Sequence, residues 1–421
     1  MKQRRTDRTI WSIQDEYGHI QTSPRGIGVE DACMDAMKEA ARPKQQTHYG
    51  EILEKPIDTA EIYNALRSGG RNKAPGSNGL EFEFYTTNWT VTREGLCDIL
   101  NQMYRDGNIT HKQKHGVIVC LPKPRGTQTP EDCRPITLLN TDYKILARIM
   151  AHRLRHIVEE HLRLTQFCGV PGNTILDAVA TVREPIAYAE IKKVPLCVLS
   201  LDFKNAFDRI SHTYLHSILQ CYGLGDPFID RLKRMYEGAT SSVQLNGPIH
   251  GPIPTRCAIR QGCPLSMLLY ALCLHPLLCT LEKKIPGIQI GRRARRTSVV
   301  AYADDITIFM TSTADFPITE DAIHQYEKAS GAYPNPQKSK VLAVGRWSTA
   351  ETVLGIEYHP HVKILGVTFW SSIEQSLNDS WMRLTGRVRM KAKNAYTRDL
   401  CLADTTDNNG SHTVYLEMSN I

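Results

Sequence analysis

The chain has 421 residues, of which 41% are apolar and 23% charged, an ordinary globular composition with room for about two to four packed subdomains. Disorder, collagen and coiled coil are therefore excluded as the main state. Fifty-one Lys and Arg against 44 Asp and Glu give a formal charge of +7. This mild basic excess suits a polyanionic partner without requiring one.

The sequence contains no membrane or export signal. No stretch approaches the roughly 20 consecutive apolar residues of a membrane helix, and the start Met-Lys-Gln-Arg-Arg-Thr-Asp-Arg has no apolar signal core. We therefore expect an intracellular chain, nuclear, cytoplasmic or both, that is not secreted and has no transmembrane segment or membrane partner.

The N-terminal region predicts an extension followed by a capped helix. Residues 1–56 are polar and weakly patterned, and we treat them as an extension. Residues 57–66 place apolar side chains on one helical face, after a capping residue at Asp58 or Thr59. The pair Gly69-Gly70 should end this helix.

A β-hairpin and a long helix follow. The β-branched run 116–121 and the segment 134–136 predict two strands, with the basic residues Lys123 and Arg134 near the hairpin tips. Residues 142–162 repeat apolar side chains at helical spacing. We expect the basic residues of this helix on a solvated face; they are Lys144, Arg148, Arg153 and Arg155.

The middle of the chain predicts a buried strand and two helices. Residues 194–201 are nearly all apolar, as in a strand buried on both faces, and Asp202 closes this run. An apolar stripe over 207–219 predicts one helix after the turn. Residues 264–281 are apolar on nearly every face and predict a helix buried by its domain.

Three carboxylates are expected to converge. Residues 298–302 and 306–310 predict a hairpin with Asp304 and Asp305 at its bend. A single antiparallel sheet can bring this bend beside Asp202. Because three carboxylates repel one another without a cation, and hard oxygen ligands favour Mg²⁺, we expect a two-ion site for phosphoryl transfer.

Three segments resemble the successive A, B and C motifs of reverse transcriptases: residues 199–208, 260–266 and 301–305. Residues 73–79 and 134–147 are similar to the fingers of the non-LTR (LINE-type) retrotransposon branch. The resemblance implies an α+β right-hand polymerase fold, in which a palm with an antiparallel sheet flanked by helices joins fingers and a partial thumb. It implies these boundaries: extension 1–56, fingers 57–195, palm 196–350 with part returning to the fingers, primer-grip hairpin 351–376, and truncated thumb or divergent tail 377–421.

The resemblance also implies which residues do the chemistry. Asp202 and Asp304 would hold two Mg²⁺ ions, for which Mn²⁺ can substitute, with Asp305 beside them. The carbonyl of Phe203 would be a further metal ligand. Lys338, in a segment similar to the fourth palm motif, would protonate the pyrophosphate leaving group.

Nucleotide-binding residues are implied in the same way. Phe207 matches the aromatic gate that excludes a 2′-hydroxyl. Gln261 and Gly262 match the segment that lies along the incoming nucleotide and template. Lys123 and Arg134 match the fingers cations that meet the triphosphate.

The expected function is an RNA-directed DNA polymerase whose partners are an RNA template, a DNA primer and deoxynucleoside triphosphates. One alternative is a catalytically inactive retroelement remnant that only binds nucleic acid, which the polar residues 404–421 favour, since the match is lost there. A second is a reverse transcriptase of the group II intron maturase type, which the LINE-like fingers segment disfavours. We expect a fragment with a truncated thumb.

Overall fold

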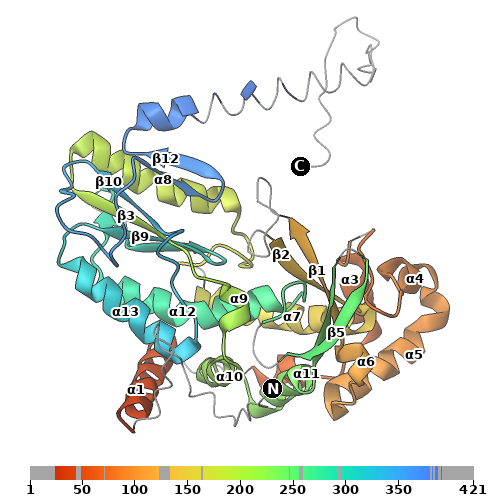
Figure 1. Ribbon diagram of the computed structural model, residues 1–421. Coiled ribbons are helices and arrows are strands. Elements are labelled where there is room, and N and C mark those ends of the chain that lie inside the picture. The colour runs from red at the N-terminus through yellow and green to blue at the C-terminus, as the bar shows by residue number, and fades with distance from the viewer. Residues whose placement is uncertain are drawn as a thin grey trace, which may run out of the picture.

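The computed structural model describes residues 24–43, 49–70, 72–122, 133–162, 165–245, 247–255, 259–291 and 295–379, with single positions at 382, 385, 386 and 390. Within them, strands form two four-stranded sheets that lie in separate lobes, and helices lie between and around these sheets (Figure 1). The prediction of an α+β chain is confirmed.

The first sheet, called the β3 sheet, has the order β10-β3-β9-β8 and is antiparallel throughout. Its strands are β3 (Leu196–Leu201), β8 (Val299–Tyr302), β9 (Asp305–Met310) and β10 (Lys340–Val344). The buried central strand and the predicted hairpin are both confirmed. Because β3 and β9 pair with Leu201 opposite Ile306, the end of β3 lies beside the bend between β8 and β9.

The β3 sheet is covered on both faces, which explains the continuous apolar run of β3. Leu196 and Val198 join a core with helix α8 (Ile175–Lys192). Cys197 and Leu199 join the larger core with helices α12 (Ser266–Lys284) and α13 (Asp315–Ser330). A strand with two covered faces needs apolar side chains at successive positions.

The second sheet, called the β1 sheet, has the order β2-β1-β4-β5. Its strands are β1 (Gly116–Pro122), β2 (Cys133–Leu139), β4 (Thr240–Gln244) and β5 (Ile249–Pro254). The hairpin predicted from the two N-terminal runs is confirmed as β1 and β2, while Lys123 lies outside the described residues. Two strands from much later in the chain complete this sheet, since β4 pairs in parallel with β1.

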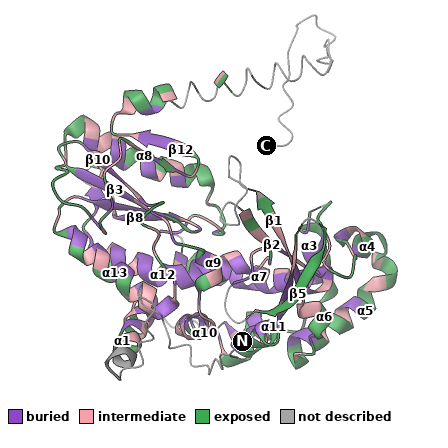
Figure 2. Cartoon of the chain, viewed as in Figure 1, coloured by how far each residue is buried: buried purple, intermediate pink, exposed green. Residues whose placement is uncertain are grey.

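Helices α7 (Thr141–Leu162) and α12 pack against each other between the two lobes (Figure 1). The buried residues gather along these two helices and the β3 sheet, whereas β5 is exposed along its length (Figure 2). The nearly uniform burial of α12 confirms the predicted core helix. In the described parts of the chain, no helix combines the length and apolarity needed to cross a bilayer.

The region treated as an extension contributes a packed helix, α1 (Pro24–Ala41). Met37 is fully buried there, and α1 packs against α12 and α13. The other elements are α2 (Gly50–Glu54), α3 (Thr59–Arg67), α4 (Phe82–Thr87), α5 (Trp89–Asn101), the π-helix η1 (Gln102–Asp106), α6 (His111–Lys114), α9 (Ala206–Arg209), α10 (His212–Cys221), α11 (Asp226–Tyr236), β6 (Ile288–Gln289), β7 (Arg296–Thr297), β11 (His361–Ile364) and β12 (Val367–Trp370).

One predicted helix is in fact two. The stripe over 207–219 falls on α9 and α10, which are separated at Ile210 and Ser211. The Ser211 side chain accepts a hydrogen bond from the Tyr214 N–H at 3.1 Å and caps α10. Apolar spacing alone does not reveal such a break, because apolar residues on both sides of it pack in the same core.

The first predicted helix is confirmed as α3, with Asp58 as its cap. Asp58 and Glu61 form a reciprocal capping box, in which the Glu61 N–H donates to the Asp58 carboxylate at 2.8 Å. The apolar face holds the three residues that the sequence placed there; they are Ile62, Ala65 and Leu66.

The prediction that the basic residues of α7 lie on a solvated face is wrong for Arg153 and Lys144. Arg153 is 4% exposed and forms a bidentate pair with Glu61 at 2.9 and 2.8 Å. Lys144 is also buried and donates to the Ala74 carbonyl at 3.0 Å. Both long side chains reach backbone and carboxylate oxygens of the preceding helices and loop, which the spacing along α7 could not show. Arg155 is exposed as predicted.

Candidate active site

A cavity of about 640 Å³ opens between the end of β3, the β8–β9 bend and strand β2. Every residue proposed for the site from the sequence lines it, except Lys123, which lies outside the described residues. They are Arg134, Asp202, Phe203, Phe207, Gln261, Gly262, Asp304, Asp305 and Lys338. The structure thus brings together residues that lie up to 204 positions apart in the chain (134 to 338).

Asp202 is held by the segment that precedes β10. Its N–H donates to the Ser339 hydroxyl at 3.0 Å, and its carbonyl accepts from the Asn335 N–H at 2.8 Å. The Asn335 side chain donates to the Asp202 carboxylate at 3.2 Å. Asn335 therefore orients this carboxylate, a role the sequence analysis missed because it considered only Lys338 in this segment.

Asp304 lies in the two-residue turn between β8 and β9, and Asp305 is the first residue of β9. Tyr302 pairs with Asp305 across the hairpin, which leaves Ala303 and Asp304 as the turn residues. Ala303 has a φ of +56°, in the left-handed region that alanine rarely occupies. This sharp turn presents both carboxylates to the cavity.

Burial and neighbouring charges shift the pKa values of Asp304 and Asp305. Burial raises the pKa of Asp304, an effect that the charge of Arg134 opposes. Burial, followed by the negative charges of Asp304 and Asp202, raises the pKa of Asp305 to about 6. Both side chains stay reachable by solvent at the cavity mouth, but the surrounding walls remove enough water to disfavour their charged forms.

The donor atoms at this site suit a hard divalent cation. Mg²⁺ is usually held by one or two carboxylates, with water and substrate phosphates completing its shell. Among the described residues, no group of three or more His, Cys, Asp or Glu side chains has metal-binding geometry. Asp202, Asp304 and Asp305 supply the cavity with carboxylate oxygens, the ligand type that such an ion prefers.

Phe207 lies on α9 at the wall of the cavity and stacks on a second ring. Its ring centroid is 4.4 Å from that of Tyr270, with 27° between the planes. Tyr270 is 1% exposed and comes from the buried helix α12. The Phe207 ring is thus backed by a fixed partner, which the sequence analysis did not anticipate.

The turn before α12 is tied to strand β2. The Thr137 N–H donates to the Gln261 carbonyl at 2.9 Å. Gly262 has a φ of +103°, and a Cβ there would lie 2.6 Å from the Thr137 carbonyl oxygen. Glycine is therefore required at this position, and the contact fixes Gln261 relative to the strand that carries the exposed Arg134.

Two further predictions concern Lys338 and a hairpin later in the chain. Lys338 is exposed on the cavity wall, and its N–H donates to the Asn335 carbonyl at 3.1 Å. A hairpin is present within residues 351–376, where one was expected, and its strands are β11 and β12. Its turn uses Leu365 at φ +50° as well as Gly366 at φ +81°.

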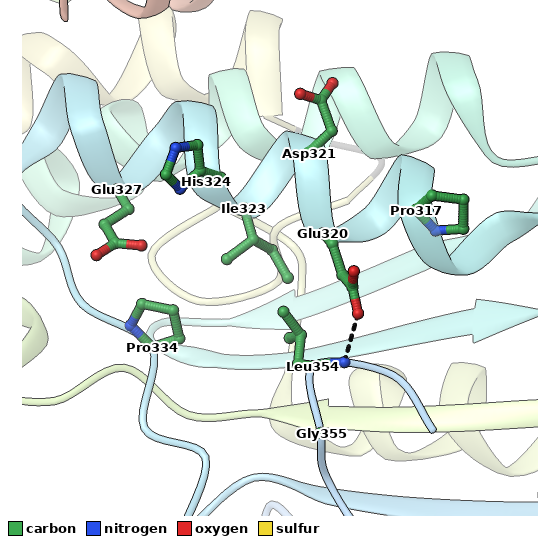
Figure 3. Close-up of a pocket in the computed structure, with 9 residues that line it drawn as sticks. All are labelled: Pro317, Glu320, Asp321, Ile323, His324, Glu327, Pro334, Leu354 and Gly355. Carbon is green, nitrogen blue, oxygen red and sulfur yellow. Dashed lines mark hydrogen bonds between the residues drawn. The ribbon is translucent and has the colours of Figure 1, made fainter. Parts of the chain in front are cut away.

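A second hollow lies on α13, away from these residues (Figure 3). Glu320 on its wall accepts a hydrogen bond from the Leu354 N–H at 2.7 Å. Asp321 points away from the hollow and pairs with Lys284 at 3.4 Å. These acidic side chains hold α13 to its neighbours, and no residue proposed for the site lies there.

Comparison with known proteins identifies the class. Residues 121–369 match the family described as reverse transcriptase (RNA-dependent DNA polymerase). This stretch covers more than half of the chain and includes the whole cavity, and the chain belongs to this family.

The similar proteins come from transposable elements. The chain is 35% identical over 295 residues to the "Transposon TX1 uncharacterized 149 kDa protein" of Xenopus laevis, covering 70% of this chain and 23% of that protein. It is 27% identical over 292 residues to the "Retrovirus-related Pol polyprotein from type-1 retrotransposable element R2" of Popillia japonica, covering 69% of this chain and 40% of that protein.

A third relative is the "Probable RNA-directed DNA polymerase from transposon BS" of Drosophila melanogaster, 27% identical over 261 residues, which cover 61% of this chain and 28% of that protein. The chain thus spans between about a quarter and two fifths of the length of these relatives. The resemblance to reverse transcriptases of non-LTR retrotransposons is confirmed.

Proposed function

We propose that the chain is an RNA-directed DNA polymerase of a non-LTR retrotransposon, which joins deoxynucleotides to a primer 3′-hydroxyl on an RNA template. The proposal rests on one observation. Asp202, Asp304 and Asp305 line the same cavity, although they come from two separate parts of the chain. Family membership adds the reaction class.

Reverse transcriptases work with divalent metal ions, and we propose two Mg²⁺ ions here, for which Mn²⁺ can substitute. Asp202 and Asp304 would hold them, with Asp305 beside them and the Phe203 carbonyl as a further ligand. When bound, such ions lower the pKa of the attacking hydroxyl and stabilise the charge of the leaving pyrophosphate. Asn335 keeps the Asp202 carboxylate turned for this task through its 3.2 Å hydrogen bond.

Other residues of the cavity would bind and select the nucleotide. The Arg134 guanidinium, with Lys123, would meet the triphosphate, since its planar fork matches phosphate oxygens. The Phe207 ring, fixed on Tyr270, would occupy the space of a 2′-hydroxyl and so select deoxynucleotides. Gln261 and Gly262 would lie along the nucleotide and template.

Lys338 would deliver a proton to pyrophosphate from the cavity wall. Its exposed ammonium sits on the segment that also orients Asp202.

We also propose a right-hand division of the chain. Residues 57–195 would form the fingers and 196–350 the palm, part of which returns to the fingers as β4 and β5, the strands that complete the β1 sheet. Residues 351–376 would supply the primer-grip hairpin, here β11 and β12, and 377–421 a truncated thumb or divergent tail. Residues 1–56 would be an N-terminal extension that packs α1 on the palm.

Primer extension tests the proposal. The purified chain is given a DNA primer on an RNA template with Mg²⁺ and deoxynucleoside triphosphates, beside Asp304→Asn and the control Asp321→Asn. Asp321 is an exposed residue of α13. We expect extension by wild type and Asp321→Asn, and a loss of about 100-fold or more for Asp304→Asn, since a metal ligand supplies several kcal/mol of charge stabilisation.

Equal extension by wild type and Asp304→Asn would refute the metal role. No extension by folded wild type that still binds the primer–template would favour the inactive remnant instead.

A further inference from the structure

We infer that Gln166 is the positioning residue of the Asp304–Asp305 bend, because its side-chain amide fixes both backbone groups of Ala303. Gln166 is not among the residues that line the cavity, so it would act only through the bend. The inference rests on the proposed polymerase function for its meaning, but its contacts are independent of that function.

The contacts are reciprocal and fully buried. The Ala303 N–H donates to Gln166 Oε1 at 2.9 Å, and Gln166 Nε2 donates to the Ala303 carbonyl at 3.2 Å. Gln166 has an exposed fraction of 0%. One amide therefore satisfies both polar backbone groups of a turn residue that has no ladder partner of its own.

The backbone around Gln166 is anchored to the strand that leads into the same bend. The Ala301 N–H donates to the Thr165 carbonyl at 2.8 Å, and the Phe167 N–H donates to the Ala301 carbonyl at 2.8 Å. Gln166 thus forms a parallel bridge with Ala301 of β8. The main chain holds the start of the hairpin arm, while the side chain reaches two residues further, to the turn.

The amide itself is fixed as well. Its Oε1 also accepts from the Cys168 N–H at 3.0 Å, so this oxygen has two backbone donors. The side chain cannot rotate without breaking bonds to both Ala303 and Cys168. This rigidity distinguishes a positioning contact from an adaptable surface hydrogen bond.

The bend needs such support because its backbone is strained. Ala303 has a φ of +56°, which costs an alanine about 1 kcal/mol. Asp304 and Asp305 follow directly, so a change in the Ala303 backbone moves both carboxylates relative to Asp202, which is held separately by Asn335.

Only a side chain with the length and amide of glutamine serves both groups of Ala303. Methionine has a similar length but neither donor nor acceptor of comparable strength, and glutamate has the same shape but no donor when ionised. Glutamate would also place its oxygen against the Ala303 carbonyl and add a charge near the aspartates.

The experiment compares Gln166→Met and Gln166→Glu with the control Gln113→Met. Gln113 is a partly buried amide of α6 that donates to Asp142 at 2.8 Å and accepts from the Thr110 N–H at 2.9 Å. The same substitution at Gln113 removes a similar local network of hydrogen bonds, at a position far along the chain from the β8–β9 bend. Three measurements are made: Mn²⁺ binding by electron paramagnetic resonance titration, kcat and KM of primer extension, and thermal unfolding.

We expect both Gln166 variants to weaken Mn²⁺ binding or lower kcat by about 10- to 100-fold, the effect typical of residues that orient metal ligands. The KM for deoxynucleotide should change by less than about twofold, because no nucleotide contact is removed. Gln113→Met should leave Mn²⁺ binding and kcat within about twofold of wild type. Wild-type Mn²⁺ binding and kcat in a folded Gln166→Met would overturn the inference.

Hydrogen exchange of wild type provides a test that needs no folded variant. The Ala303 amide should exchange as slowly as the ladder amides of β9, although it lies in a turn. Fast exchange there would overturn the inference. If wild type binds Mn²⁺ in a Gln166-dependent way but does not extend a primer, the polymerase proposal fails and this inference stands.

Discussion

Arg153 offers the sharpest test of how the N-terminal helices are fixed to the long helix α7. Its guanidinium forms the bidentate pair with Glu61 and also donates to the Lys55 carbonyl at 2.7 Å and the Pro56 carbonyl at 3.1 Å. It lies over the ring of Tyr104 with 5.0 Å to the centroid. One cation therefore joins α3, the segment before it and α7.

Arg153→Met keeps the apolar stem and removes the charge. Glu61, whose side chain is 21% exposed, then loses its main partner, and the carbonyls of Lys55 and Pro56 each lose a donor. Removal of one member of a buried ion pair costs about 3–5 kcal/mol, because an uncompensated charge remains. Since Glu61 keeps some solvent, we expect the free energy of unfolding to fall by about 3 kcal/mol.

Urea unfolding followed by circular dichroism measures this loss. Arg155→Met is the matched control, since Arg155 lies two positions further on the same helix and is exposed. Its free energy of unfolding should stay within about 0.5 kcal/mol of wild type. A loss below about 1 kcal/mol for Arg153→Met, or equal losses for both variants, would refute the reasoning.

Three further predictions concern stability and the cavity. Burial lowers the pKa of His275 to about 3, so the folded chain keeps this imidazole neutral while the unfolded chain binds a proton below about pH 6.5. As the pH is lowered from about 6.5 toward 3, the free energy of unfolding should therefore fall by about 1.4 kcal/mol per pH unit. His275→Gln should reduce that slope in urea titrations at several pH values. Gly262→Ala should lower primer extension by at least about tenfold, because the new Cβ meets the Thr137 carbonyl at 2.6 Å; unchanged extension would show that the turn does not need this close approach. Phe207→Ala should admit ribonucleotides in extension assays with each nucleotide class, and unchanged sugar discrimination would reject the gate role.

The sequence was sufficient to predict the strands and the hairpin that carry the aspartates. The apolar run of β3 reflects two covered faces, and the two β-rich runs on either side of the β8–β9 bend define a hairpin, so the strand ends could be placed beside each other by pairing rules alone. The break between α9 and α10 was not predictable from spacing, since Ile210 ends α9 and Ser211 caps α10 without interrupting the apolar stripe.

Residues that act through long-range contacts could not be found in this way. Gln166 and Asn335 orient the aspartates from loops whose local patterns are unremarkable, because their partners are backbone and carboxylate groups more than 130 positions away. Arg153 and Lys144 looked like solvated cations because helical spacing does not show which oxygens surround them. A one-dimensional pattern records periodicity, whereas these roles depend on tertiary neighbours.

The most direct test of the account is the position of the divalent ions. Anomalous scattering from crystals of the chain grown with Mn²⁺ and a deoxynucleoside triphosphate would locate them. The account predicts ions bridged by carboxylate oxygens of Asp202 and Asp304 at distances of about 2.0–2.4 Å. Ions bound elsewhere, with Asp202 taking no part in their coordination, would contradict it.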